Sequence, residues 1–468
     1  MVFSSVEFLL YFLPIFFIIY ALVPERLRNL VLLLGSLIFY AYGEPQFLLL
    51  LVVSVIVNYM AARFIGAENY YEEKYKNQEK YDTYQEWRKG VMLFIVTINV
   101  GILLLFKVVM GGDTLPLGVS FYTFQILSYM IDVYRRDIPA ETSLLKLGTY
   151  IAMFPQLVSG PIVNYDEVSE TLAHRRMTWK SVQNGLKVFT LGLASKVLIA
   201  DRIGYLWNDI QVQGYESISI QMAWLGAIAF SFKIYFDFYG YSLMAIGLGS
   251  MMGFKLPENF HNPYMADSVR DFYRRWHITL SRWFCNYVYI PLGGSRNGEF
   301  CTIRNLLIVW ALTGLWHGGS GNFLLWGIML WAVIVIERQV IGFLDRHPVG
   351  GESLWKQLNI IPRLYVWAII PVTWMFFAIT DIEQLKIYVG RMFGSTPEYV
   401  VAGDWRTPLA TYGGLFVVAA LASTPILKRI YHRWRDSMVM NVVLAALFWI
   451  CVWRIMVEGN NPFMYFKF

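Results

Sequence analysis

The sequence predicts an all-α, polytopic integral membrane protein, and three observations support this class. Hydrophobic residues make up 57% of the 468 residues and charged residues only 15%, whereas soluble domains carry about 25% charged residues. Apolar runs long enough to cross a bilayer, about 17–25 residues each, recur along the whole chain. The three cysteines show neither close pairing nor metal-like spacing. Together these features exclude a disordered chain, a disulfide-stapled scaffold and a soluble enzyme.

One predicted domain, residues 1–468, contains about eleven to thirteen membrane helices of that length. The runs lie at 6–23, 29–43, 47–65, 91–110, 117–133, 183–200, 217–236, 303–316, 321–337, 361–380, 408–425 and 438–456. Two stretches, 148–163 and 237–254, are apolar but interrupted by Gly, Pro or polar residues, which predicts re-entrant or in-plane helices buried within protein. No Lys or Arg precedes the first run, so we expect a retained span rather than a cleaved signal peptide.

Basic residues predict the orientation, because Lys and Arg accumulate in cytoplasmic loops. Because successive spans cross the membrane in opposite directions, this rule places the N-terminus outside and a charged loop over 66–90 in the cytoplasm. It places the aromatic tail 457–468 on the extracytoplasmic side. The basic residues assigned to the cytoplasm are Arg26, Arg28, Arg135, Arg136, Lys146, Arg175, Arg176, Lys180, Lys428, Arg429, Arg433 and Arg435. The net charge of +6 then reflects cytoplasmic loops and predicts no nucleic-acid partner.

The most charged stretch between apolar runs predicts one amphipathic helix over 270–282. One of its faces holds Arg270, Arg274, His277 and Ser281. The neighbouring face is aromatic and apolar and holds Tyr273, Trp276, Leu280 and Trp283. Such a helix lies along the membrane, with its arginines on lipid headgroups, or lines a polar cavity.

His317 ends an apolar run and precedes the glycine-rich stretch Gly318–Gly321. An ionisable residue at such a place is usually functional, and imidazole exchanges protons near neutral pH. The glycines permit a chain break and close approach of a ligand. A buried neutral His bonded to a backbone carbonyl is the alternative, and the residues alone leave both open. No third ligand at metal spacing accompanies His277 and His317, so we expect no metal.

Three further charged residues interrupt apolar segments. We expect Asp237 to pair with an arginine of the 270–282 helix, in a structural role. Lys187 and Lys196 lie in an otherwise apolar helix, and we expect their ammonium groups to reach the membrane interfaces.

The motif Tyr273-Arg-Arg-Trp-His-Ile-Thr-Leu-Ser281, followed by Gly314-Leu-Trp-His-Gly318, resembles the membrane-bound O-acyltransferase family. Further stretches resemble its bacterial branch that contains the alginate O-acetyltransferase membrane subunit. They are Met1–Ser5, Phe121–Arg135, Phe154–Pro161, Ala245–Phe254 and Tyr289–Gly294. The resemblance is densest over 230–327, the predicted catalytic core segment. It implies a bundle of membrane helices around a central tunnel.

The resemblance also implies roles for individual residues. His317 matches the catalytic histidine of the family's Trp-His-Gly motif and would act as general base on the acceptor hydroxyl. His277 matches a second active-site position, where it or a nearby arginine would hold the acceptor or stabilise the oxyanion. The donor implied is acetyl-CoA on the cytoplasmic side, with its phosphates on the basic 270–282 face, and no cofactor is permanently bound. Residues expected to bind donor or acceptor are Arg274, Arg275, Asn259, Trp316 and Asp237.

The tail Asn461–Phe468 resembles the end of branch members, which implies that Tyr465 relays the acyl group outside the membrane. The alternative is an aromatic anchor at the interface. Three stretches depart from the branch pattern and leave the acceptor open: Asp237–Leu243, Cys285–Asn286 and Gly318–Gly321. The Cys285 thiol is a second conceivable acyl carrier, although a lone apolar cysteine usually serves packing.

The function expected from this resemblance is O-acetylation of an exported polysaccharide, performed in the bacterial cytoplasmic membrane with an extracytoplasmic transferase of the Ser-His-Asp type as partner. Within the class, the rival is D-alanyl transfer towards teichoic acid from a carrier-protein thioester. From other classes, a transporter of a polymer or lipid-linked sugar and a non-catalytic scaffold remain open.

Overall fold

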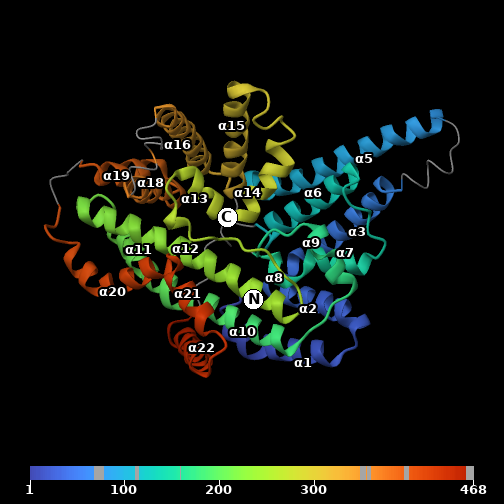
Figure 1. The fold of residues 1–468 in the computed structure, drawn as a ribbon, viewed down its shortest axis with the longest axis horizontal. Coiled ribbons are helices and arrows are strands. Elements are labelled where there is room, and N and C mark those ends of the chain that lie inside the picture. The colour runs from blue at the N-terminus through green and yellow to red at the C-terminus, as the bar shows by residue number, and fades with distance from the viewer. Residues whose placement is uncertain are drawn as a thin grey trace. The chain divides into compact units, whose positions relative to one another are not determined.

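The structure is a computed structural model that describes residues 1–67, 78–110, 115–158, 160–347, 355, 360–394 and 400–459 (Figure 1). Within these residues it contains helices and no strand, which confirms the all-α class. Among the described residues, five helices are long and apolar enough to cross a membrane: Pro45–Ile65, Tyr81–Val109, Gly321–Arg346, Ile361–Ala378 and Met438–Glu458. Arg406–Ala422 and Pro425–Trp434, bent by 70° at their junction, would make a sixth as one broken span.

Several predicted spans coincide with shorter helices. For example, α2 (Arg28–Gly43) has 16 residues and is about 24 Å long at 1.5 Å per residue, against a hydrocarbon core of about 30 Å. The predicted charged loop over 66–90 is wrong in its second half, because α5 (Gln78–Leu104) already begins there. The first half of that loop extends over 68–77, which lie outside the described residues.

Two contact-defined units divide the chain, and the first comprises Met1–Phe189 and Tyr241–Pro257. Its helices are α1 (Leu13–Leu22), α2, α3 (Leu48–Ile65), α5, α6 (Val119–Arg135), α7 (Leu144–Ala152), α8 (Phe154–Leu157), α9 (Tyr165–Ala173), the first part of α10 (Trp179–Ala194) and the end of α12 (Ile220–Met251). Every residue of α6 from Val119 to Met130 is buried, which identifies α6 as an interior helix of this unit.

The interrupted stretch 148–163 forms α7 and α8, two short helices separated at Met153, and their residues from Leu147 to Leu157 are buried. This confirms the prediction of interrupted helices within protein. The other such stretch, 237–254, is different, because it continues α12 without a break. Its glycines serve close packing instead: a Cβ on Gly247 would lie 2.6 Å from the carbonyl oxygen of Gly185 on α10.

The second unit comprises Thr190–Gly240 and, within the described residues, everything from Glu258 to Gly459. Its helices are the end of α10, the π-helical turn Ser195–Ala200, α11 (Asp201–Gln213), most of α12, α13 (Val269–Arg275), α14 (Ile278–Phe284), α15 (Gly298–His317), α16 (Gly321–Arg346), α18 (Ile361–Ala378), α19 (Ile382–Met392), α20 (Arg406–Ala422), α21 (Pro425–Trp434) and α22 (Met438–Glu458). Both histidines of the family motifs lie in this unit.

A tight hairpin of α15 and α16 carries His317 to its position. A Cβ on Gly314 would lie 2.5 Å from the carbonyl oxygen of Phe323, and one on Gly327 would lie 2.3 Å from that of Trp310. Real Cβ atoms do not approach so closely, so these two positions require glycine. The glycines thereby let the two helices touch along their backbones and fix His317, the last residue of α15, at the hairpin turn.

Candidate active site

The predicted continuous helix over 270–282 is wrong, because the helix breaks at His277. Helix α13 ends at Arg275, α14 begins at Ile278, and His277 between them is left-handed with φ 45°. An extended segment causes the break by taking over backbone groups: the His261 N–H donates to the Arg275 carbonyl at 2.9 Å, and the Ile278 N–H to the Asn259 carbonyl at 3.0 Å.

Because of this break, the four polar residues that the sequence predicted on one helix face do not share one environment. Arg270 and Arg274 are exposed, whereas His277 is only 2% exposed and lies in the interior. The neighbouring aromatic face is buried as predicted, with Tyr273, Trp276, Leu280 and Trp283. His277 is therefore part of a dry, enclosed site, while the arginines remain at the surface.

Asn259 determines which nitrogen of His277 carries the proton. Its Oδ1 accepts the Thr279 N–H at 3.2 Å and the Thr279 hydroxyl at 3.0 Å, and it lies 3.1 Å from His277 Nδ1. A backbone N–H can only donate, so the amide atom facing it is the oxygen. His277 Nδ1 must then donate to the same oxygen, which leaves the lone pair on Nε2. Burial lowers the pKa of His277 to about 3, so the ring is neutral.

Trp316 lies between the two histidines. Its ring centroid is 6.2 Å from that of His277 and 4.8 Å from that of His317. His317, 4% exposed, also contacts Trp326 at 5.2 Å and Phe377 at 5.1 Å between ring centroids. The structure thus brings both predicted histidines, 40 residues apart in sequence, to one aromatic enclosure. Water is largely excluded there, which strengthens any electrostatic interaction with a reacting group.

Further aromatic residues complete this enclosure. Trp374 lies 4.9 Å from Trp276 and 6.1 Å from Trp326 between ring centroids, and Tyr273 lies 6.3 Å from Trp326. Sequence reasoning did not identify Trp326, Trp374 or Phe377, because aromatic residues are common throughout this chain. Thr279 was missed as well, although it belongs to the same motif as His277.

The ion pair that the structure shows for Asp237 is with Lys196, and not with an arginine of the predicted helix as expected. Its carboxylate lies 2.8 Å from the Lys196 ammonium, and both side chains are 4% exposed. Lys196 also contacts Asp201 at 2.6 Å. The expectation that Lys196 reaches an interface is therefore wrong, because two carboxylates hold its charge in the interior. This triad ties α12 to the end of α10 and the start of α11.

The remaining predicted binding residues lie apart from the histidines' enclosure or outside the described structure. Arg275 forms an ion pair with Asp271 at 2.8 Å, and Arg274 lines a separate surface pocket. Cys285 is exposed. Tyr465 lies outside the described residues. Within the part of the chain that the structure describes, no group of three metal-ligating side chains is found.

The sequence profile of the membrane-bound O-acyltransferase family matches residues 37–379, which include both histidines. The probable alginate O-acetylase AlgI of Pseudomonas putida is 33% identical over 100% of both chains. The peptidoglycan O-acetyltransferase of Helicobacter pylori is 29% identical over 98% of this chain and 89% of that protein. A teichoic acid D-alanyltransferase of Bacillus subtilis is 26% identical over 45% of this chain and 56% of that protein.

The chain belongs to the membrane-bound O-acyltransferase family. It is an O-acyltransferase, and its apolar helices make it a multi-pass membrane protein.

Proposed function

We propose that this enzyme transfers an acetyl group from cytoplasmic acetyl-CoA for the O-acetylation of an exported polysaccharide. The observation that carries the proposal is the shared enclosure of His277 and His317 around Trp316. The names of the relatives support the acetyl group and a glycan acceptor, because those similar over nearly the whole chain are O-acetylating proteins of alginate and peptidoglycan. The enzyme would act in the bacterial cytoplasmic membrane, with an extracytoplasmic transferase receiving the acetyl group.

His317 is the proposed general base. It takes the proton of the acceptor hydroxyl while the hydroxyl oxygen attacks the thioester carbonyl, so a C–O bond forms. The C–S bond then breaks, and the imidazolium of His317 returns the proton to the departing thiolate. His317 is the last residue of α15, at the end where the helix dipole is negative.

His277 is the proposed acceptor-holding residue. Its Nδ1–H is committed to Asn259, so Nε2 presents a lone pair and not a proton. A neutral ring in this tautomer accepts a hydrogen bond from a hydroxyl but cannot donate one to an oxyanion. Of the two roles expected for this position, the tautomer supports holding the acceptor. The hydroxyl offered could be that of Tyr465 as a relay or that of a partner.

The test is transfer of radiolabel from acetyl-CoA to protein and polymer in isolated membranes. We expect transfer to fall at least about 100-fold in H317A, because a positioned general base contributes about 10²–10⁴, and to fall in H277A. The matched control is H432A, since His432 is an exposed histidine on α21, and it should transfer at the wild-type rate. Equal insertion of all variants is verified by quantitative immunoblotting.

Each alternative function predicts a different result. Wild-type acetylation by the double variant H277A/H317A would support the scaffold and refute the proposal. Polymer export that survives H317A without any acetyl transfer by the wild-type protein would support the transporter. Labelling from a D-alanyl carrier-protein thioester, but not from acetyl-CoA, would identify the enzyme as a D-alanyltransferase.

A further inference from the structure

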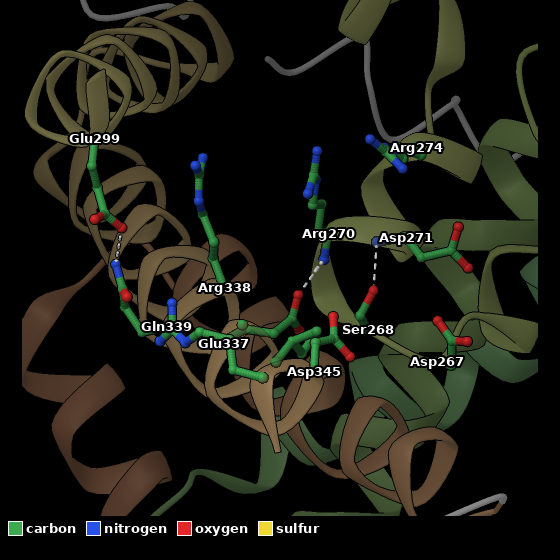
Figure 2. Close-up of a pocket in the computed structure, with 13 residues that line it drawn as sticks. Asp267, Ser268, Arg270, Asp271, Arg274, Glu299, Glu337, Arg338, Gln339 and Asp345 are labelled. Carbon is green, nitrogen blue, oxygen red and sulfur yellow. Dashed lines mark hydrogen bonds between the residues drawn. The ribbon is translucent and has the colours of Figure 1, made fainter. Parts of the chain in front are cut away.

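A surface pocket of about 520 Å³ lies between α13 and the C-terminal part of α16 (Figure 2), and neither His277 nor His317 lines it. Three of the arginines that line it, Arg270, Arg274 and Arg338, carry no side-chain hydrogen bond or ion pair to any described residue. In Figure 2 their guanidinium groups point into the same open space. Unpaired arginines that share one cavity form a site suited to an anion with several charges.

The electrostatic surroundings confirm that these arginines lie close together. Partial burial lowers the pKa of the Arg270 guanidinium and the positive charges of Arg274 and Arg338 lower it further, against smaller opposing effects of Tyr289 and Glu337. Like charges at this range repel one another, so the cluster costs free energy in the unliganded protein. A bound polyanion would remove that cost and gain charge-assisted hydrogen bonds.

Five carboxylates also line the pocket, but four of them are already engaged. Both oxygens of Glu337 accept backbone N–H groups at the start of α13, from Val269 at 2.5 Å and from Arg270 at 3.1 Å. Asp271 pairs with Arg275, and Glu299 accepts a hydrogen bond from Gln339. Asp345 also has a partner, and in Figure 2 both it and Asp267 lie below the level of the guanidinium groups. The pocket therefore holds five carboxylates beside four arginines, and the guanidinium groups of Arg270, Arg274 and Arg338 lie together on one side of it.

The spacing between this pocket and the histidines matches one kind of polyanion. Arg338 follows Trp326, which contacts His317, by 12 residues on α16, or about 18 Å at 1.5 Å per residue. The pantetheine arm of CoA has about the length of five extended residues, or roughly 16–18 Å. The arm of a CoA thioester is therefore long enough to span the part of α16 between Trp326 and Arg338.

We propose that Arg270, Arg274 and Arg338 bind the pyrophosphate and 3′-phosphate groups of CoA and so select a CoA thioester as donor. This inference rests on the proposed use of acetyl-CoA. It adds Arg338, on a helix that the sequence did not connect with the donor. It also separates donor recognition by the surface arginines from the chemistry performed by the buried histidines.

The test compares CoA binding by purified full-length variants in nanodiscs. We expect R338Q and R270Q each to raise the Kd for CoA about ten-fold or more, because one charge-assisted phosphate contact is lost. The matched control R429Q removes an exposed arginine of α21 and should bind CoA like the wild type. R338K, which keeps the charge but not the planar fork, should recover part of the affinity.

A phosphate-free donor separates this site from general damage. In the membrane transfer assay, kcat/KM for acetyl-CoA should fall in R338Q, whereas kcat/KM for acetyl-pantetheine should stay at the wild-type value. Equal losses with both donors, or wild-type CoA affinity in R338Q and R270Q, would overturn the assignment while the proposed function stands. A wild-type protein that neither binds CoA nor uses acetyl-CoA would overturn both.

Discussion

Replacing Asn259 by alanine should disable the site through His277. Asn259 is 1% exposed, and its Oδ1 serves the ring of His277 and both donors of Thr279. The Thr279 hydroxyl can turn to another acceptor, but the two N–H groups cannot. Each buried donor left without an acceptor costs about 1–3 kcal/mol, so N259A should lose about 2–6 kcal/mol of folding stability.

Acetyl transfer should fall further than stability accounts for. N259A removes the acceptor that holds the proton on His277 Nδ1, and loss of such an orienting partner typically reduces activity about 10–100-fold. The assay is initial-rate radiolabel transfer at a temperature where N259A remains folded, with thermal unfolding in detergent measured alongside.

T279V is the matched control, because it removes only the hydroxyl and leaves the His277–Asn259 contact in place. It should lose about 1 kcal/mol and keep nearly the wild-type rate. N259D retains an acceptor oxygen and adds a negative charge, which raises the pKa of His277 from its low value and favours the imidazolium. Nε2 is then protonated at low pH, so transfer by N259D should rise with pH. A wild-type rate and pH profile in both Asn259 variants would refute the reasoning.

Three further outcomes are expected, all measured by thermal unfolding in detergent. G327A should lose about 1–3 kcal/mol of folding stability, because its Cβ would collide with the backbone of α15. The control G342A, which has open space around it, should be neutral or slightly stabilising. Equal stability of the two variants would contradict the close packing of α15 and α16. K196M should be more destabilising than D237N, because it leaves the carboxylates of Asp201 and Asp237 without their cation. D237N still leaves the Lys196 ammonium paired with Asp201. Burial lowers the pKa of His277, so below about pH 6.5 the unfolded chain binds a proton that the folded protein does not. The free energy of unfolding should therefore decrease as pH falls from about 6.5 towards 3, and it should decrease less in H277Q.

Local sequence patterns sufficed for the all-α class and for both histidines, because apolar runs and two dense motifs are visible without tertiary structure. The pairing of Lys196 with Asp237 was not predictable, since it joins residues 41 positions apart on different helices. The glycines of the 237–254 stretch were misinterpreted as a break for a physical reason. A missing Cβ permits either an unusual backbone or a close helix contact, and only the neighbouring helix decides which.

The helix break at His277 could not be predicted, because the polar residues of this segment follow the spacing of a continuous helix. Polar residues at 270, 274, 277 and 281 fit an unbroken helix, and the residue that interrupts it, Asn259, lies 18 positions upstream. An unbroken helix would have set His277 on the face of Arg270 and Arg274, exposed to water and to their positive field. The left-handed residue costs about 1–3 kcal/mol as backbone strain, and the hydrogen bonds from Asn259 offset it. In return, one short motif supplies two environments: a charged surface suited to phosphates and, three residues later, a dry site holding a neutral imidazole in a single tautomer.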